Sequence, residues 1–106
     1  MQRQEIITQI IKMIRRSTYT ARACEELESL GFEGTVMKHH TDTEFGKAMG
    51  GLEILNYITG SSYDNIYDQA YNEATQDIIT AKGSIVELLD LAGFDGERYY
   101  NNSINH

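Results

Sequence analysis

Apolar side chains recur along this chain of 106 residues at alternating intervals of three and four, the spacing of amphipathic helices. The first series indicates a helix from about Gln2 to Leu30. Its middle, Ser17 to Thr20, consists of weak helix formers, so we expect either one continuous helix or two helices separated by a break near Arg16. Gly31 predicts a Schellman closure of this helix, in which the glycine takes the left-handed conformation.

The second helix is expected to follow a connector formed by residues 34–40. Thr41 and Glu44 match the capping box, in which the hydroxyl and the carboxylate each bond a backbone amide at a helix start. We therefore expect a helix that begins at Thr41 and is stopped by Gly60. Because small or apolar residues lie on two opposite sides of it, this helix is predicted to be the central one.

The third series is the longest and predicts one helix of about 30 residues, from Ser61 or Ser62 to Ala92. The short joint at Gly60 makes the second and third helices an antiparallel hairpin. The chain is thus predicted to be all-α, an antiparallel bundle of three helices, or four if the first helix breaks, with a long C-terminal helix. Residues 1–96 would form a single helical-bundle domain and residues 97–106 a flexible polar tail.

A short sequence occurs after two of the apolar series. Gly31–Gly34 and Gly93–Gly96 both read Gly-Phe-acid-Gly. The simpler interpretation is that the same helix-stop chemistry is used twice, and the alternative is an internal duplication, which should extend further along the chain.

Three glycines lie within the predicted second helix, at Gly46, Gly50 and Gly51. Each costs roughly 0.5–1 kcal/mol relative to alanine, so a bare backbone there should serve close packing. The neighbour could be the slim Ser17 to Cys24 stretch of the first helix, a second copy of the chain, or a ligand. We predict that these glycines form an interface, inside the chain or across a two-fold axis.

Charge is unevenly distributed, since the net charge is −7 although residues 1–23 hold five basic residues and one acid. The overall acidity disfavours binding to a nucleic-acid backbone. Five residues share the side of the first helix opposite its apolar seam: Lys12, Arg15, Arg16, Tyr19 and Arg22. This basic stripe could bind a nucleotide or phosphate, with arginines on the oxygens and the tyrosine on a base. Otherwise it is a solvated face, or one paired with acids of a neighbouring helix.

Tyrosines are concentrated around the second joint. Tyr63, Tyr67 and Tyr71 are spaced by four residues and Tyr57 precedes them, so they could form the centre of a protein interface or belong to the core. We place Tyr57, Tyr63 and Tyr67 with the three glycines in the predicted interface. The tail tyrosines, Tyr99 and Tyr100, could dock on a partner.

The sequence offers little support for catalysis or metal binding. Cys24, the one cysteine, lies on the apolar side of a helical series, and His39 with His40 lack a second pair of ligands. We therefore expect no catalytic residue, no metal site and no cofactor. A single buried cysteine and the lack of any long apolar run favour a cytoplasmic protein with no membrane contact.

These features predict a small non-catalytic interaction protein of the adaptor, inhibitor or mobile-element accessory type. It would self-associate as a dimer or a larger oligomer and bind a protein partner. The alternative is a nucleotide-binding or phosphate-binding sensor or sponge that uses the basic stripe.

Overall fold

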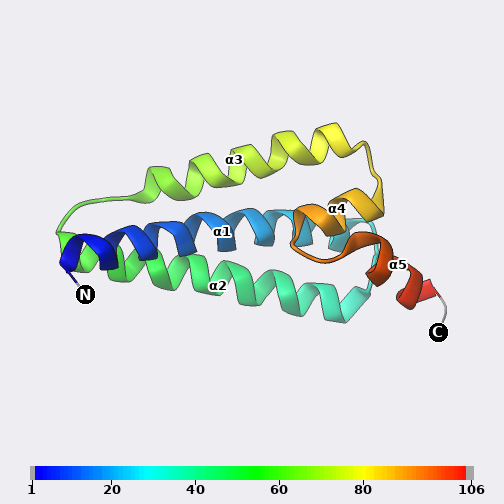
Figure 1. Cartoon of the computed structure of the whole chain (residues 1–106), viewed down its shortest axis with the longest axis horizontal. Helices are drawn as coiled ribbons and strands as arrows, with labels where there is room; N and C mark the ends of the chain where they lie inside the picture. The colour runs from blue at the N-terminus through cyan, green and yellow to red at the C-terminus, as the bar shows by residue number, and fades with distance from the viewer. Residues whose placement is uncertain (1, 105–106) are drawn as a thin grey trace.

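The computed structural model describes residues 2–104, which form five α-helices and no strand (Figure 1). The helices are α1 (Arg3–Ser29), α2 (Gly34–Thr59), α3 (Asp64–Ala81), α4 (Ile85–Leu91) and α5 (Gly96–Ile104). The predicted all-α class is confirmed. The three expected helices have become five because the third is divided and the C-terminal segment is itself helical. None of the described helices is long and apolar enough to span a lipid bilayer.

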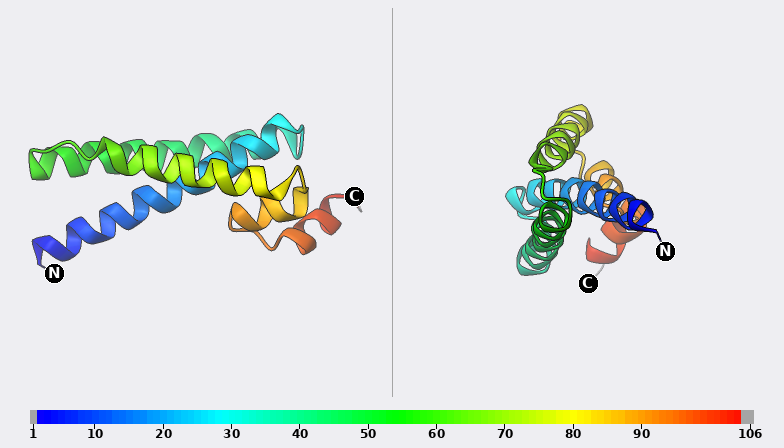
Figure 2. Two further views of the ribbon diagram at one scale, coloured as in Figure 1. Left: turned by 90° about the horizontal axis from the view of Figure 1, so that it is seen from above. Right: turned by 90° about the vertical axis from the view of Figure 1, so that its left-hand side faces the viewer.

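The central helix is α1, and not the helix that ends at Gly60 as the sequence suggested. α2 returns antiparallel to α1, and α3 then runs in the direction of α1 along another side of it (Figures 1 and 2). α2 and α3 are antiparallel as expected, but they pack mainly on α1 rather than on each other. α1 therefore lies between α2 and α3 and contacts both of them.

Two clusters of buried side chains hold these helices together. The first joins Ile7 and Ile14 of α1 to Leu52 and Leu55 of α2 and to Ile66 of α3. The second surrounds the C-terminal half of α1 and also takes in α4: Ala23, Cys24, Leu27, Met37, Ile78, Ala81, Leu88, Leu89 and Ala92. Because α1 contributes to both clusters on more than one of its sides, it occupies the middle of the fold.

α1 is continuous, so the form broken near Arg16 is not observed. Ser17 and Thr18 are buried, and the Thr18 hydroxyl donates a 2.6 Å hydrogen bond to the Ile14 carbonyl oxygen within the helix. Small side chains at these positions let a neighbouring helix approach closely, which offsets their weak helix propensity.

Both copies of the Gly-Phe-acid-Gly sequence close a helix with the predicted Schellman pattern. Phe32 N–H donates to the Leu27 carbonyl at 3.0 Å, and Phe94 N–H donates to the Leu89 carbonyl at 3.0 Å. Gly31 and Gly93 take the required left-handed conformation, with φ of 77° and 89°. The interpretation that one helix-stop chemistry is used twice is confirmed for this backbone geometry.

α2 begins at Gly34, so the predicted connector over residues 34–40 and the capping box at Thr41 are both wrong. Thr41 is buried inside the helix, and its hydroxyl donates a 2.9 Å hydrogen bond to the Met37 carbonyl oxygen. Met37 is fully buried in the second cluster. Burial of this side chain accounts for a helix that extends well before its apparent capping sequence.

The predicted long third helix is divided at Lys82 and Gly83, which have φ of 51° and 79°. Ser84 starts α4 by accepting a hydrogen bond from the Glu87 N–H at 3.3 Å. The turn sends Leu88 and Leu89 back against the C-terminal half of α1, where both are fully buried. A single straight helix would have left these leucines beyond the end of the bundle.

The segment expected to be a flexible tail is helix α5 as far as Ile104, and residues 105–106 lie outside the described part of the chain. Tyr99 packs against Phe94 with ring centres 4.8 Å apart, and Tyr100 stacks on Phe32 at 6.3 Å. Gly96 N–H donates a 2.8 Å hydrogen bond to the Asp90 carboxylate, which fixes the start of α5. Aromatic packing thus orders a segment whose composition is mostly polar.

Candidate functional site

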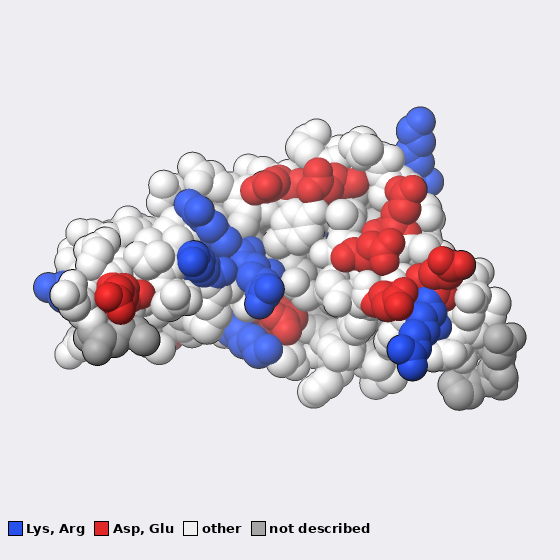
Figure 3. Space-filling view, in the orientation of Figure 1, with Lys and Arg blue, Asp and Glu red and all other residues white. Residues whose placement is uncertain are grey.

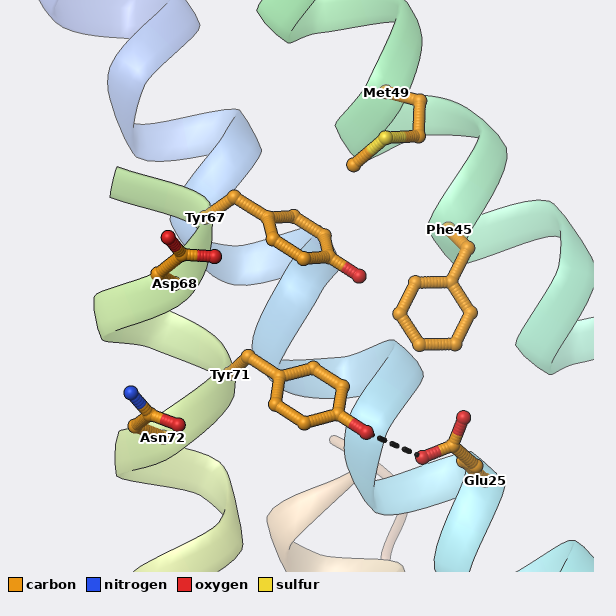
Figure 4. Close-up of a pocket in the computed structure, with 7 residues that line it drawn as sticks. All are labelled: Glu25, Phe45, Met49, Tyr67, Asp68, Tyr71 and Asn72. Atoms are coloured by element: carbon orange, nitrogen blue, oxygen red, sulfur yellow. Dashed lines mark hydrogen bonds between the residues drawn. The ribbon is translucent and has the colours of Figure 1, made fainter. Parts of the chain in front are cut away.

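An open cleft lies between α2 and α3, with α1 beneath it (Figure 4). It has a volume of about 690 Å³. Phe45 and Met49 line it from α2, Glu25 rises from α1, and α3 supplies four residues: Tyr67, Asp68, Tyr71 and Asn72. We call this site the aromatic cleft.

The aromatic side chains face one another across the cleft. Tyr67 and Tyr71 are four residues apart on α3, so they project from the same side of that helix and stack with ring centres 6.1 Å apart. Phe45 approaches Tyr67 from α2, with ring centres 6.4 Å apart and planes inclined by 43°. These three rings are only half-buried, and Met49 beside them is exposed, so part of the apolar surface of each remains accessible to solvent.

A polar network closes one end of the aromatic cleft. The Tyr71 hydroxyl donates a 3.0 Å hydrogen bond to a Glu25 carboxylate oxygen (Figure 4). Arg22 forms ion pairs with Glu25 at 3.4 Å and Glu26 at 3.2 Å, and its guanidinium lies 5.5 Å from the centre of the Tyr71 ring. Its Nε also donates to the Thr75 hydroxyl at 3.1 Å. The network fixes α3 against α1 at this point.

The environment of the cleft favours neutral phenols. Burial raises the pKa of Tyr67, and the nearby carboxylates of Glu25 and Asp68 raise it further. Burial also raises the pKa of Tyr71, and its hydrogen bond to Glu25 adds to the shift. The negative charge at this site would therefore attract a cationic group.

A second hollow of about 460 Å³ adjoins the aromatic cleft and shares Glu25 and Phe45 with it. Its other lining residues come from the end of α1 and the first half of α2: Glu28, Ser29, Lys38, Thr41 and Asp42. Lys38 lies 4.0 Å from Glu28, which is a weak surface ion pair. The two hollows together form a groove that is apolar at its centre and predominantly acidic along its edges.

The five residues of the predicted basic stripe have separate environments. The Tyr19 hydroxyl donates a 2.5 Å hydrogen bond to Asp77 of α3, and Arg22 faces α3 through its bond to Thr75. Burial, followed by the bond to Asp77, raises the pKa of Tyr19. Lys12, Arg15 and Arg16 are exposed, and within residues 2–104 they take part in no ion pair. Figure 3 shows basic side chains gathered over the middle of α1 and an acidic one nearer the N-terminal end, while other acidic side chains follow α3 and lie around α4 and α5.

The three predicted interface glycines also differ from one another. Gly51 is buried against α1, where an added Cβ would lie 2.5 Å from Met13 Cε and 3.0 Å from Ile14 Cγ1. Gly46 and Gly50 face away from α1, and an added Cβ at either would meet nothing within 4 Å. Of these three glycines, only Gly51 therefore serves close packing inside the chain.

The predicted interface tyrosines are similarly divided. Tyr57 is 89 % exposed on α2, whereas Tyr67 lies in the aromatic cleft. Tyr63 is half-buried at the start of α3, and its N–H donates a 2.9 Å hydrogen bond to the Asn56 side chain. Tyr99 and Tyr100, which were expected to be available to a partner, are packed against Phe32 within the fold.

The residues considered for nucleophilic or metal chemistry do not form a site. Cys24 is fully buried, and burial raises the pKa of its thiol to about 11. His40 packs edge-on against Phe94 with ring centres 5.5 Å apart. Among residues 2–104, no group of three histidine, cysteine or acidic side chains is placed to hold a metal ion.

The sequence singles out both tyrosines of the cleft but not Glu25, Phe45 or Met49. Phe45 and Met49 are four residues apart and share one side of α2, but this spacing is the same for cleft residues and core residues. Nothing in the sequence connects Glu25 to Tyr71, because the two are 46 positions apart and meet only through packing of α1 with α3.

No protein-family description, curated protein or solved structure shows a significant match to this chain. The function of the protein therefore has to be inferred from the geometry of the site.

Proposed function

We propose that this protein is a small non-catalytic interaction protein, of the adaptor, inhibitor or mobile-element accessory type, that self-associates and binds a protein partner. The aromatic cleft carries the proposal, because Phe45, Tyr67 and Tyr71 line an open depression of about 690 Å³. Tyrosine combines a large apolar body with a polar tip, which makes it frequent at the centre of protein interfaces. A solvated cleft with two such rings and a phenylalanine is suited to receive side chains of another protein.

The outer surface of α2 adds support for association. Ile54 and Tyr57 are 55 % and 89 % exposed, and Gly46 and Gly50 lie on the same outward side of the helix. Ile54 and Tyr57 are three residues apart on a helix and therefore adjacent, and contiguous exposed apolar side chains are a feature of contact surfaces. A second copy or another protein would cover them.

The state of Cys24 supports a non-catalytic role. A thiol with a pKa of about 11 is almost entirely protonated at neutral pH, and the thiolate is the nucleophilic form. We further propose that the protein acts in the cytoplasm, where a reducing environment would keep this single thiol in its reduced form.

Light scattering after size-exclusion chromatography tests self-association. We expect a molar mass above the 12.0 kDa of one chain, rising with protein concentration. A mass of one chain at every concentration would contradict this part of the proposal.

Quantitative affinity capture from the cells that produce the protein tests partner binding. The aromatic cleft predicts a protein that wild type retains and the Tyr67→Ser variant loses. Ile79→Ser is the control, because Ile79 is 63 % exposed on α3 and lies outside the cleft and the outer surface of α2. Partner binding at the cleft is wrong if capture by wild type and Tyr67→Ser is the same.

The exposed cations of α1 favour a second candidate function, binding of a nucleotide or another phosphate ligand. Lys12, Arg15 and Arg16 have no acidic partner within 4.0 Å in the described part of the chain. Because Tyr19 and Arg22 form hydrogen bonds with α3, phosphate binding would depend on Lys12, Arg15 and Arg16 alone. A thermal-shift screen with nucleotides should then show stabilisation that is lost when Arg15 and Arg16 are both replaced by glutamine.

A further inference from the structure

The N-terminal half of α1 presents a face that carries two apolar side chains, two cations and one exposed acid, Glu5, so its net charge is positive. Ile6 and Met13 are each 40 % exposed, and Lys12 and Arg16 are exposed beside them. At about 100° per residue, these four side chains fall within about 120° of the helix circumference. Viewed end-on, this half of α1 projects beyond α2 and α3 (Figure 2). We call this surface the α1 ridge.

The aromatic cleft and the adjoining hollow form a groove whose apolar and acidic side chains are complementary to those of the α1 ridge. Its centre is apolar, and four acids line it: Glu25, Glu28, Asp42 and Asp68. Glu25 is balanced by Arg22, and Glu28 lies near Lys38. Asp42 and Asp68 form no ion pair within residues 2–104, so they are available to a cation from outside.

The ridge and the groove lie on opposite sides of the molecule. Arg16 of the ridge and Glu25 of the groove are nine residues apart on the continuous α1, which places them about 180° apart around the helix axis. One molecule therefore cannot seat its own ridge in its own groove. A second copy can supply the missing surface.

We propose that copies of this chain associate head to tail, with the α1 ridge of one copy seated in the aromatic cleft of the next. Ile6 and the exposed part of Met13 would meet the apolar surface formed by Phe45, Met49 and Tyr67, while the Met13 methyl group stays packed on Gly51 of its own chain. Lys12 and Arg16 would face Asp42 and Asp68. This inference specifies the interface for the proposed self-association and rests on it. Because two different surfaces are joined, the assembly is a closed ring or an open chain and not a two-fold dimer.

Sedimentation velocity of the full-length protein provides the test, using single charge reversals on the two surfaces. Arg16→Glu changes only the ridge and Asp68→Arg only the cleft. Each is expected to weaken association at least tenfold when measured alone, because like charges then face each other. Raising NaCl from about 50 mM to about 500 mM should weaken association of the wild type in the same direction.

Mixing the two variants makes the test specific to a head-to-tail interface. In an equimolar mixture, the reversed ridge of the Arg16→Glu variant can bind the reversed cleft of the Asp68→Arg variant. The unchanged ridge of the second variant can bind the unchanged cleft of the first. Association should therefore return to the wild-type level. A two-fold dimer would be restored in the same way only if Arg16 and Asp68 lay on one surface, and the positions of the ridge and the groove on opposite sides of the molecule exclude that arrangement.

Three further variants serve as controls. Arg98→Glu on α5 and Glu73→Arg on α3 make the same changes in net charge at exposed positions outside the ridge and the cleft, and both should associate as the wild type does. Gly50→Leu changes only the outer side of α2. Far-ultraviolet circular dichroism and the melting temperature establish that each variant is folded before its association is compared.

The possible results distinguish head-to-tail docking from self-association in general. Loss of association in each charge variant with recovery in the mixture supports head-to-tail docking. If the wild type associates and both charge variants associate equally well, or if only Gly50→Leu abolishes association, the docking is wrong while self-association stands. A wild type that remains a single chain at about 0.5 mM, far above the dissociation constants of specific complexes, would overturn both.

Discussion

The Tyr71 hydroxyl of α3 donates a 3.0 Å hydrogen bond to the Glu25 carboxylate of α1, at the end of the aromatic cleft. The same ring lies 5.5 Å from the guanidinium of Arg22. The hydrogen bond fixes α3, which lines one side of the cleft, to α1, which lies beneath the cleft. It also keeps the Glu25 charge at the cleft instead of leaving it free in solvent.

Replacing Tyr71 by phenylalanine should lower the free energy of unfolding by about 0.5–1.5 kcal/mol, because a half-buried hydrogen bond is lost while the ring remains. Urea denaturation measures the change. Tyr57→Phe is the matched control and should have no measurable effect, since Tyr57 is almost fully exposed. Equal effects of the two substitutions would show that the Tyr71–Glu25 bond contributes nothing to stability.

Two glycine-to-alanine substitutions should change stability in opposite directions. A Cβ on Gly96 would overlap the Val86 carbonyl oxygen, which belongs to a backbone that cannot move freely, so Gly96→Ala should cost about 1–3 kcal/mol. A Cβ on Gly46 meets nothing, so Gly46→Ala should add about 0.5–1 kcal/mol through its higher helix propensity. Thermal unfolding at low protein concentration, where single chains dominate, measures both. A stabilising Gly96→Ala would contradict the packing of α5 on α4.

Stability should decrease in alkaline solution. The pKa of Cys24 rises from 9.0 to about 11 on folding, and burial also raises the pKa of Tyr19, Tyr67, Tyr71 and Tyr99 above their ordinary value. In each case the folded state holds the proton more tightly than the unfolded chain does. The corresponding stabilisation is complete below the unfolded pKa and is lost as pH rises through the folded pKa.

The free energy of unfolding should therefore fall between about pH 9 and pH 11, as measured by urea denaturation at a series of pH values. Cys24→Ala removes the group that ionises first on unfolding, so its stability should fall less steeply in this window even if its absolute stability is lower. A slope for Cys24→Ala as steep as that of the wild type would contradict the burial of a neutral thiol.

Features that depend on local chemistry could be predicted from the sequence. The glycines at positions 31 and 93 indicated two helix ends, and both adopt the expected Schellman bonds. The four-residue spacing of Tyr67 and Tyr71 correctly placed both rings on one side of a helix. In these cases the residue that determines the geometry and the geometry itself lie within a few positions of each other.

Features that depend on distant neighbours could not be predicted. Thr41 and Glu44 match a capping box, yet burial of Met37 against α1 and α4 extends the helix past it. The series from Tyr67 to Ala92 is consistent with a straight helix, yet a turn at Lys82 brings Leu88 and Leu89 onto α1. The aromatic cleft exists because α2 and α3 both pack on α1, and no sequence pattern shows which helix lies at the centre.

We propose above all that the aromatic cleft is a docking surface. Nuclear magnetic resonance spectra recorded at increasing protein concentration test it most directly, with amide and side-chain shifts assigned across residues 2–104. We expect concentration-dependent shifts at Met49, Tyr67 and Asp68 in the cleft and at Lys12 and Arg16 on the α1 ridge. Shifts that appear only around Gly50 and Tyr57 on the outer side of α2, or spectra that do not change with concentration, would contradict the claim.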